Sequence, residues 1–303
     1  MNRLIFVLIF GLLVFFELKP QDYVWWNEIH NWDGISKWED YIIKSPGFLG
    51  PNALPVPRVT DGTVTENLEF QIATDFHFSK GDKTQNIFLW INYPVVKNII
   101  SMEFYVVPLE HYKMTEEMRD LRFSRDYDGE GISGGDIYFA TLIQILREKD
   151  KWPDIALRLT CKTASSENLG GARFTDSPGY FFDLSFGKKI SPGINLSGMA
   201  GFYVWQINYY NGFISHRQDD AFLFGISAEK TIKNLSVSNT IAGYLGYLDI
   251  KDKPIVYRLD LKKKIGKIDV HAGYQYGIND VKYHMFRVSV FFSFEKGIIE
   301  FPL

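Results

Sequence analysis

Three side chains have the types that nucleophilic catalysis requires. His77 and Ser79 stand two residues apart and Asn92 follows, so the set could supply a base, a hydroxyl nucleophile and an orienting amide. Side chains two residues apart share a face when the backbone is extended. His77, Ser79 and Asn92 are therefore a candidate catalytic set, and the simpler interpretation is a polar wall histidine beside a turn serine.

A second group consists of Asp126, Asp128 and Glu130, three carboxylates at a spacing of two residues. Calcium accepts hard oxygen ligands of this kind, but a complete calcium loop also carries a distant bidentate glutamate, which is absent here. A solvated acidic loop is the simpler interpretation. The chain has one cysteine and no histidine pair at zinc spacing. We therefore expect no cofactor, and Asp126, Asp128 and Glu130 are kept only as an alternative metal site.

The elements that position these side chains are extended strands. Apolar and polar residues alternate with period two in many stretches, for example residues 68–78, 180–186 and 286–294. Period two indicates strand, because successive side chains point to opposite faces. Stretches of about 9–12 residues match tilted strands that cross a bilayer. The expected fold is all-β, an antiparallel transmembrane β-barrel of about twelve strands.

The connections between the expected strands fall into two classes. Tight turns, several of them bearing lysine, alternate with longer loops that are rich in acids, glycine and tyrosine. In outer-membrane barrels the short turns face the periplasm and the long loops face outward. The strands are expected near residues 67–79, 86–94, 98–108, 135–147, 154–164, 178–188, 194–207, 220–231, 235–248, 254–263, 267–277 and 284–294.

Charged side chains fall on the face of each expected strand that lies opposite the apolar face. In residues 154–164, Arg158 and Lys162 oppose Leu157 and Leu159. A charge facing lipid at the midplane costs about 2–4 kcal/mol, so the charged faces are expected to line a mixed, ion-paired lumen. The expected lumen-lining residues are Glu69, Asp75, His77, Glu103, Arg158, Lys162, Asp183, Glu229, Arg258, Asp260, Lys262, Asp269, His271 and Arg287.

The two ends of the chain do not alternate. Arg3 followed by the apolar residues 4–16 is the pattern of a signal peptide. The stretch that follows is rich in tryptophan and proline, and a short helix is expected over residues 36–44 because Ser36 could cap it and Pro46 would stop it. The expected domains are a signal peptide over residues 1–20, an N-terminal periplasmic extension or plug over 21–66, the barrel over 67–294 and a C-terminal tail over 295–303.

Two stretches of sequence resemble known families. His77-Phe78-Ser79 with a later asparagine resembles the motif of the outer-membrane phospholipase A family, although Lys80-Gly81 stands where that family has Asn-Gly. Residues 153–165 and 173–188 resemble uncharacterised outer-membrane barrels that are similar to the phenol-degradation-pathway family of transporter-like barrels. The first resemblance implies a twelve-stranded lipid hydrolase. The second implies a barrel with a transport role and supplies no catalytic residues.

From these patterns we expect a porin-like channel or transporter for small solutes, rather than an enzyme, in the cell outer membrane. Its expected partners are outer-membrane lipids, the barrel assembly machinery and a small solute. The net charge of −3 gives no reason to expect nucleic acid as a partner. A phospholipase A-like lipid hydrolase and a structural or adhesive barrel are the alternatives. The many charged lumen positions favour a channel over a purely structural barrel.

Overall fold

The computed structural model divides the chain into two compact units, residues 1–35 and residues 36–303. The predicted signal peptide and the predicted tail over residues 295–303 lie outside the described residues. Within the part of the chain that is described, no helix has the length and apolar character needed to cross a membrane. The described residues are 23–149, 151–166, 168–205, 209–210, 215–216, 220–246, 252–266 and 268–294.

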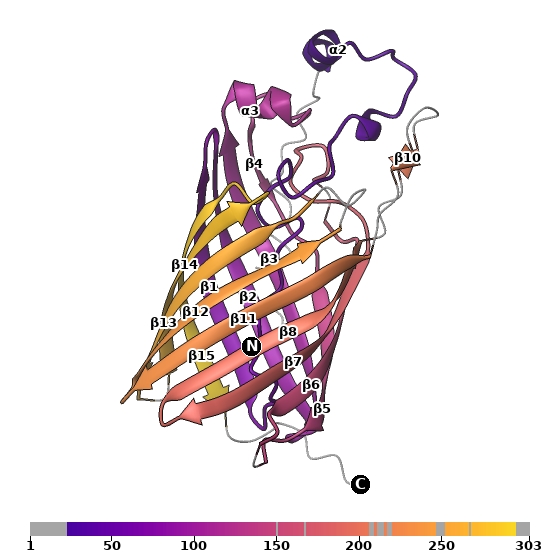
Figure 1. The fold of residues 1–303 in the computed structure, drawn as a ribbon. Coiled ribbons are helices and arrows are strands. Elements are labelled where there is room, and N and C mark those ends of the chain that lie inside the picture. Colours follow the sequence, from indigo (N-terminus) through magenta and orange to yellow (C-terminus); the bar gives the residue numbers. More distant parts are fainter. Residues whose placement is uncertain are drawn as a thin grey trace, which may run out of the picture. The chain divides into compact units, whose positions relative to one another are not determined.

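In the described part of the second unit, twelve strands close into an antiparallel barrel, which confirms the predicted fold. Neighbours in the ring follow the order of the chain, and β1 closes it by pairing with both β2 and β15. Figure 1 shows the strands strongly tilted around the barrel. The strands are β1 (Leu68–Ser79), β2 (Asp82–Val96), β3 (Ile100–Met114), β5 (Tyr138–Leu146), β6 (Asp154–Lys162), β7 (Gly179–Ser191), β8 (Ile194–Trp205), β11 (Ala221–Ile232), β12 (Leu235–Leu245), β13 (Ile255–Ile265), β14 (Ile268–Asn279) and β15 (His284–Phe294).

The faces of the barrel are inverted relative to a soluble protein. In β1 the Asp75 side chain is 1% exposed and its neighbour Phe76 is 37% exposed. In β7 Asp183 is 0% exposed and Leu184 is 49% exposed. Because side chains alternate along a strand, the polar set lies inside the barrel and the aromatic and aliphatic set covers its outside. This arrangement suits a protein whose outer surface is surrounded by lipid.

The two ends of the barrel differ in their connections. At the short-turn end, residues 192–193 join β7 to β8 and residues 233–234 join β11 to β12. The other end, which we call the long-loop end, carries residues 115–137 and 163–178. It also carries the short helix α3 (Glu116–Leu121) and the short strand β4 (Glu130–Ser133), which pairs with β3. The first strand therefore begins, and the last one ends, at the short-turn end.

Several short elements are not predicted by the alternation pattern. Helix α3 begins after Thr115, whose hydroxyl accepts a hydrogen bond from the Met118 amide, as an N-cap residue does. The strands β9 (Tyr209–Tyr210) and β10 (Ser215–His216) form a small hairpin. These elements are too short to show a period, so a sequence pattern does not reveal them.

The helices before the barrel differ from those expected: an unexpected helix lies at residues 24–30, and the helix expected over residues 36–44 is only a short 3-10 turn. In the first unit, α2 (Val24–His30) is helical, and the Trp26 ring packs edge-on against Trp32 at 6.4 Å between centroids. In the second unit, the helix predicted over residues 36–44 is reduced to the 3-10 turn η1 (Trp38–Asp40). The residue in the N-cap position of η1 is Lys37 and not Ser36, and its side chain makes no capping hydrogen bond.

We predict that Leu184→Arg prevents assembly of the barrel. Leu184 lies near the middle of β7 on the outer face, where an arginine facing lipid costs about 2–4 kcal/mol. The matched control is Ser238→Arg, which enters the lumen beside Asp260, its partner in the strand pairing. Heat-modifiable gel mobility measures the folded fraction, and equal yields for both variants would contradict the assignment of faces.

Candidate functional site

The lumen of the barrel is occupied by the chain's own residues 45–66, which we call the luminal segment. Near the long-loop end, the Ser45 hydroxyl donates to Asp252 at 2.9 Å, and the Asn52 amide donates to Glu110 at 2.6 Å. Near the short-turn end, the Gln144 side chain accepts from the Val64 amide at 2.8 Å. The segment therefore runs the length of the barrel interior before β1 begins.

The middle of the luminal segment is held by hydrogen bonds from the wall to consecutive backbone carbonyls. Every carbonyl oxygen from residue 54 to residue 58 accepts one such bond, and the donors come from β6, β8, β12 and β13. The bonds run from the Tyr244 hydroxyl to Leu54 (3.1 Å), from the Tyr203 hydroxyl to Pro55 (2.9 Å), from Arg258 Nη2 to Val56 (2.6 Å), from Arg258 Nη1 to Pro57 (3.0 Å) and from Arg158 Nη2 to Arg58 (2.9 Å).

The composition of the luminal segment explains why this mode of binding works. Pro51, Pro55 and Pro57 have no backbone N–H, and proline also favours extended backbone in the residue before it. An extended segment cannot satisfy its own carbonyls, and a buried carbonyl needs a partner. Tyrosine hydroxyls and arginine guanidinium groups are donors that can reach inward from the strands. The wall and the segment are thus complementary in hydrogen-bonding capacity.

Two glycines allow the segment to approach the wall closely at the short-turn end. A Cβ added to Gly187 would lie 2.0 Å from the Asp61 carbonyl oxygen, so a larger residue there would displace the segment. Gly62 has φ of +73°, in the region that side chains other than glycine rarely adopt. Its carbonyl accepts a hydrogen bond from Gln144 Nε2 at 2.9 Å. The turn at Gly62 directs the chain along the wall toward β1.

At the long-loop end, a buried charge network lies beside the luminal segment. Arg173 donates to Glu110 at 2.7 Å and to Asp82 at 2.8 Å, and Arg122 donates to the same Asp82 oxygen at 2.6 Å. A Cβ at Gly50 would lie 2.8 Å from the Arg173 guanidinium, so the segment packs directly on this network. Breaking such a network by removing one partner is costly, because the remaining charge stays buried. The network therefore fixes the loops and the segment together.

Burial also shifts ionisation in the loops beside this network. The pKa of Asp176 is raised because the carboxyl is partly buried, although it accepts hydrogen bonds from the Ser166 hydroxyl and the Leu169 amide. The pKa of Lys44 is lowered because burial disfavours its charged form, and the nearby carboxylates Asp40 and Asp176 oppose that change. Asp176 and Lys44 are thus packed within the long-loop end rather than fully solvated.

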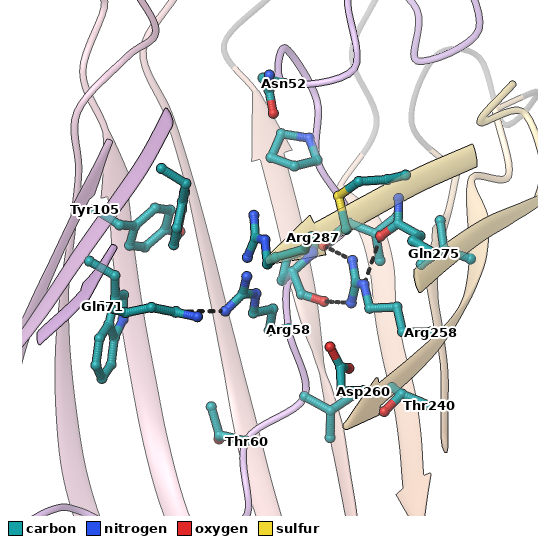
Figure 2. Close-up of a pocket in the computed structure, with 18 of the residues that line it drawn as sticks. Asn52, Arg58, Thr60, Gln71, Tyr105, Thr240, Arg258, Asp260, Gln275 and Arg287 are labelled. Carbon is teal, nitrogen blue, oxygen red and sulfur yellow. Dashed lines mark hydrogen bonds between the residues drawn. The ribbon is translucent and has the colours of Figure 1, made fainter. Parts of the chain in front are cut away.

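A cavity of about 510 Å³ remains beside the luminal segment. Figure 2 shows that Arg58 of the segment, Arg258 of β13 and Arg287 of β15 point toward it from different sides. Arg287 is paired with Asp75 through two hydrogen bonds. Within the described part of the chain, neither Arg58 nor Arg258 forms an ion pair with a carboxylate; Arg58 instead bonds to the Gln71 side chain at 3.3 Å.

The predicted lumen residues fall into two groups. The first group lines the cavity, and the second lies in the wall with an identified contact or partial burial. In the second group, Asp75 pairs with Arg287, Asp183 with Arg158 at 2.8 Å and Asp269 with Lys262 at 3.3 Å, while Lys162 pairs with Asp136 and Glu69 is half-buried. The cavity-lining residues are His77, Glu103, Arg158, Glu229, Arg258, Asp260, Lys262, His271 and Arg287.

The alternation pattern does not identify Arg58, Tyr203 or Tyr244 as lumen contacts. Arg58 lies outside the alternating stretches, in a segment whose position no local pattern fixes. Tyr203 and Tyr244 lie on the lumen face of their strands. The lumen residues are predicted from charged positions, however, and tyrosine is uncharged. The cluster of three prolines in residues 51–57 is the one signal that could have pointed to an extended, carbonyl-rich segment.

The candidate catalytic residues are not brought together. His77 Nε2 is 2.9 Å from the Asn86 side-chain oxygen, and the Ser79 hydroxyl donates to the Asp82 carbonyl at 3.4 Å. Asn92 pairs with Glu69, at the opposite end of β1 from His77. A serine nucleophile needs a base within hydrogen-bond reach, and the described contacts give Ser79 a carbonyl acceptor instead.

The three candidate metal ligands do not form one site. Asp126 accepts a hydrogen bond from the Tyr112 hydroxyl, Glu130 pairs with Lys113 at 2.6 Å, and Asp128 is exposed. Among the described residues, no three histidine, cysteine, aspartate or glutamate side chains are grouped as metal ligands would be. The acidic stretch therefore behaves in this structure as a hydrogen-bonded loop.

Comparison with known proteins gives similarity to solved barrels only. No protein-family model matches the chain, so the resemblance to the phenol-degradation-pathway family stays a prediction. No curated protein matches its sequence. Similar solved structures include the NanC porin (9% identity, 74% of this chain and 98% of that chain covered, TM-score 0.49) and the KdgM porin in complex with disordered oligogalacturonate (10%, 74%, 99%, 0.46). The outer-membrane phospholipase A from Escherichia coli is another (7%, 83%, 98%, 0.39). These likenesses concern the barrel fold alone.

We predict that Arg258→Met loosens the luminal segment. The variant removes both donors to the Val56 and Pro57 carbonyls, and a hydrogen bond from a charged group contributes about 1.5–3 kcal/mol. Hydrogen–deuterium exchange of residues 50–66 should become about tenfold faster or more. The control is Lys262→Met, because Lys262 lines the same cavity but pairs with Asp269. Equal exchange in the two variants would show that Arg258 does not hold the segment.

Proposed function

We propose that this protein is an outer-membrane channel for small polar solutes, kept narrow by its luminal segment. The observation that carries the proposal is the cavity of about 510 Å³ between the segment and the wall, whose lining includes charged side chains of both signs. The outer face of aliphatic and aromatic side chains supports a location in a membrane. The signal-peptide pattern in residues 1–20 supports export to the outer membrane.

The number of strands supports a narrow passage rather than a wide pore. A barrel of about eight strands is filled by its own side chains, whereas 16–18 strands leave an aqueous channel. Twelve strands lie between these cases, and here the luminal segment takes up part of the remaining space. A solute would therefore pass beside the segment, or the segment would have to move.

The lining suggests a polar solute that can meet charges of both signs. Arg58 and Arg258 have no carboxylate partner among the described residues, and Glu103, Glu229 and Asp260 line the same cavity. Separated charges of opposite sign suit a solute with both donors and acceptors. The resemblance to transporter-like barrels agrees with a transport role. The described contacts of His77, Ser79 and Asn92 give the lipid-hydrolase alternative no support.

We predict that the combined variant Tyr203→Phe, Tyr244→Phe, Arg258→Met has a larger single-channel conductance than the unmodified protein. It removes the wall donors to the carbonyls of residues 54–57, so the segment should be held less tightly and obstruct the passage less. The measurement is single-channel recording in planar bilayers, with folding checked by heat-modifiable mobility.

The control for this experiment is the combined variant Tyr274→Phe, Lys262→Met. Both of these residues line the cavity, and their described bonds go to His284 and Asp269 and not to the luminal segment. It should not show the increase in conductance, because the luminal segment keeps its wall donors. A correctly folded triple variant that conducts no better than this control would contradict the proposal that the luminal segment narrows the channel. Absence of conductance in every variant would contradict the channel itself.

A further inference from the structure

The direction in which the luminal segment runs has a topological consequence. Its last residues lie at the short-turn end, where the Asn98 amide donates to the Thr65 carbonyl at 3.4 Å and Arg147 donates to the Val64 carbonyl at 2.9 Å. Strand β1 begins there with Leu68. The chain that precedes β1 therefore enters the barrel wall from the short-turn end, after passing through the lumen.

The first residues of the luminal segment lie at the opposite end. Ser45 bonds to Asp252 in the connection between β12 and β13, and the Gly50 amide donates to the Ala172 carbonyl at 2.9 Å. A Cβ at Gly47 would lie 3.5 Å from the Asp280 carbonyl in the connection between β14 and β15. All three contacts are with connections of the long-loop end.

Residues 36–44 continue among the same loops and do not return into the barrel. The Arg125 guanidinium stacks over the Trp38 ring at 4.6 Å, and the Tyr41 and Phe123 rings are 6.2 Å apart. Arg125 and Phe123 belong to residues 115–137 of the long-loop end. From the sequence we expected residues 21–66 to form a periplasmic extension or a plug. In the structure, residues 36–44 lie at the long-loop end, where Trp38 and Tyr41 pack on loop side chains.

We propose that residues 36–44, which precede the luminal segment, are displayed on the outer surface of the cell and are connected to β1 through the protein's own lumen. The proposal rests on the outer-membrane location proposed above, with the long loops facing outward, and does not depend on solute passage. If the segment left the lumen, the five consecutive carbonyls of residues 54–58 would lose their hydrogen-bond donors. The Arg173 network would also lose its contact with Gly50. These contacts hold the segment inside the lumen, between residues 36–44 and β1.

The test is cysteine labelling of intact cells in a Cys161→Ala background. Cys161 is the chain's single cysteine, and its removal leaves no competing thiol. Lys37→Cys reports on the displayed region, because Lys37 is exposed and precedes η1. Glu117→Cys, at an exposed position of α3, marks the long-loop end. Ser191→Cys, exposed beside the β7–β8 turn, marks the short-turn end. A membrane-impermeant maleimide is applied before and after permeabilisation, and labelling after unfolding in detergent sets the full value for each variant.

We expect the Lys37 and Glu117 variants to label fully on intact cells and the Ser191 variant to label only after permeabilisation. Labelling of the Lys37 variant only after permeabilisation, with Glu117 labelled on intact cells, would place residues 36–44 in the periplasm and overturn the proposal. Labelling of neither variant on intact cells would overturn it as well, because the long-loop end would then face the periplasm. Each outcome is independent of conductance, so failure of the channel proposal is distinguished from failure of surface display.

Discussion

The structure depends on one constraint, which is that the backbone carbonyls of a segment buried in a barrel must find donors in the wall. Residues 54–58 meet it through four side chains that project inward from four different strands. Arg258 serves two adjacent carbonyls, and Arg158 serves a third while pairing with Asp183 at 2.8 Å. Unsatisfied buried carbonyls would cost free energy comparable to lost hydrogen bonds. The positions of the segment and of these strands are therefore coupled.

The polar lumen is a consequence of the membrane around the barrel. Lipid excludes charge from the outer face, so the charged side chains of the strands must turn inward, where they need partners. Asp183 of β7 forms an ion pair with Arg158 of β6, and Asp75 of β1 forms one with Arg287 of β15. Arg258 differs from these residues, because its described acceptors are the Gln275 side chain and the luminal segment. The hydrogen bonds of Arg258 therefore depend on the luminal segment being in the lumen.

The two ends of the barrel have different roles in this arrangement. At the long-loop end, the buried cluster of Arg173, Arg122, Asp82 and Glu110 joins the loops to β2 and β3 and packs on Gly50. At the short-turn end, glycines at positions 62 and 187 allow the backbone to pass close to the wall. The luminal segment is thus fixed at both ends and bonded along its middle, so it narrows the lumen along its length. The same attachment defines where the chain before residue 45 emerges.

The sequence by itself determined the strands, their faces and the contrast between short turns and long loops. The stretch predicted over residues 194–207 is β8 (Ile194–Trp205), whereas β2 begins at Asp82 rather than near residue 86. Period-two alternation is a local property, and the exclusion of charge from lipid fixes which face turns inward, so both can be read along the chain. Only the tertiary structure decided which charges pair, that Ser79 does not meet His77, and where residues 36–66 lie. The contacts of residues 36–66 join residues far apart in the chain, such as Arg258 and Pro57, which are 201 positions apart. The proline-rich segment has no periodicity from which its partners could be inferred.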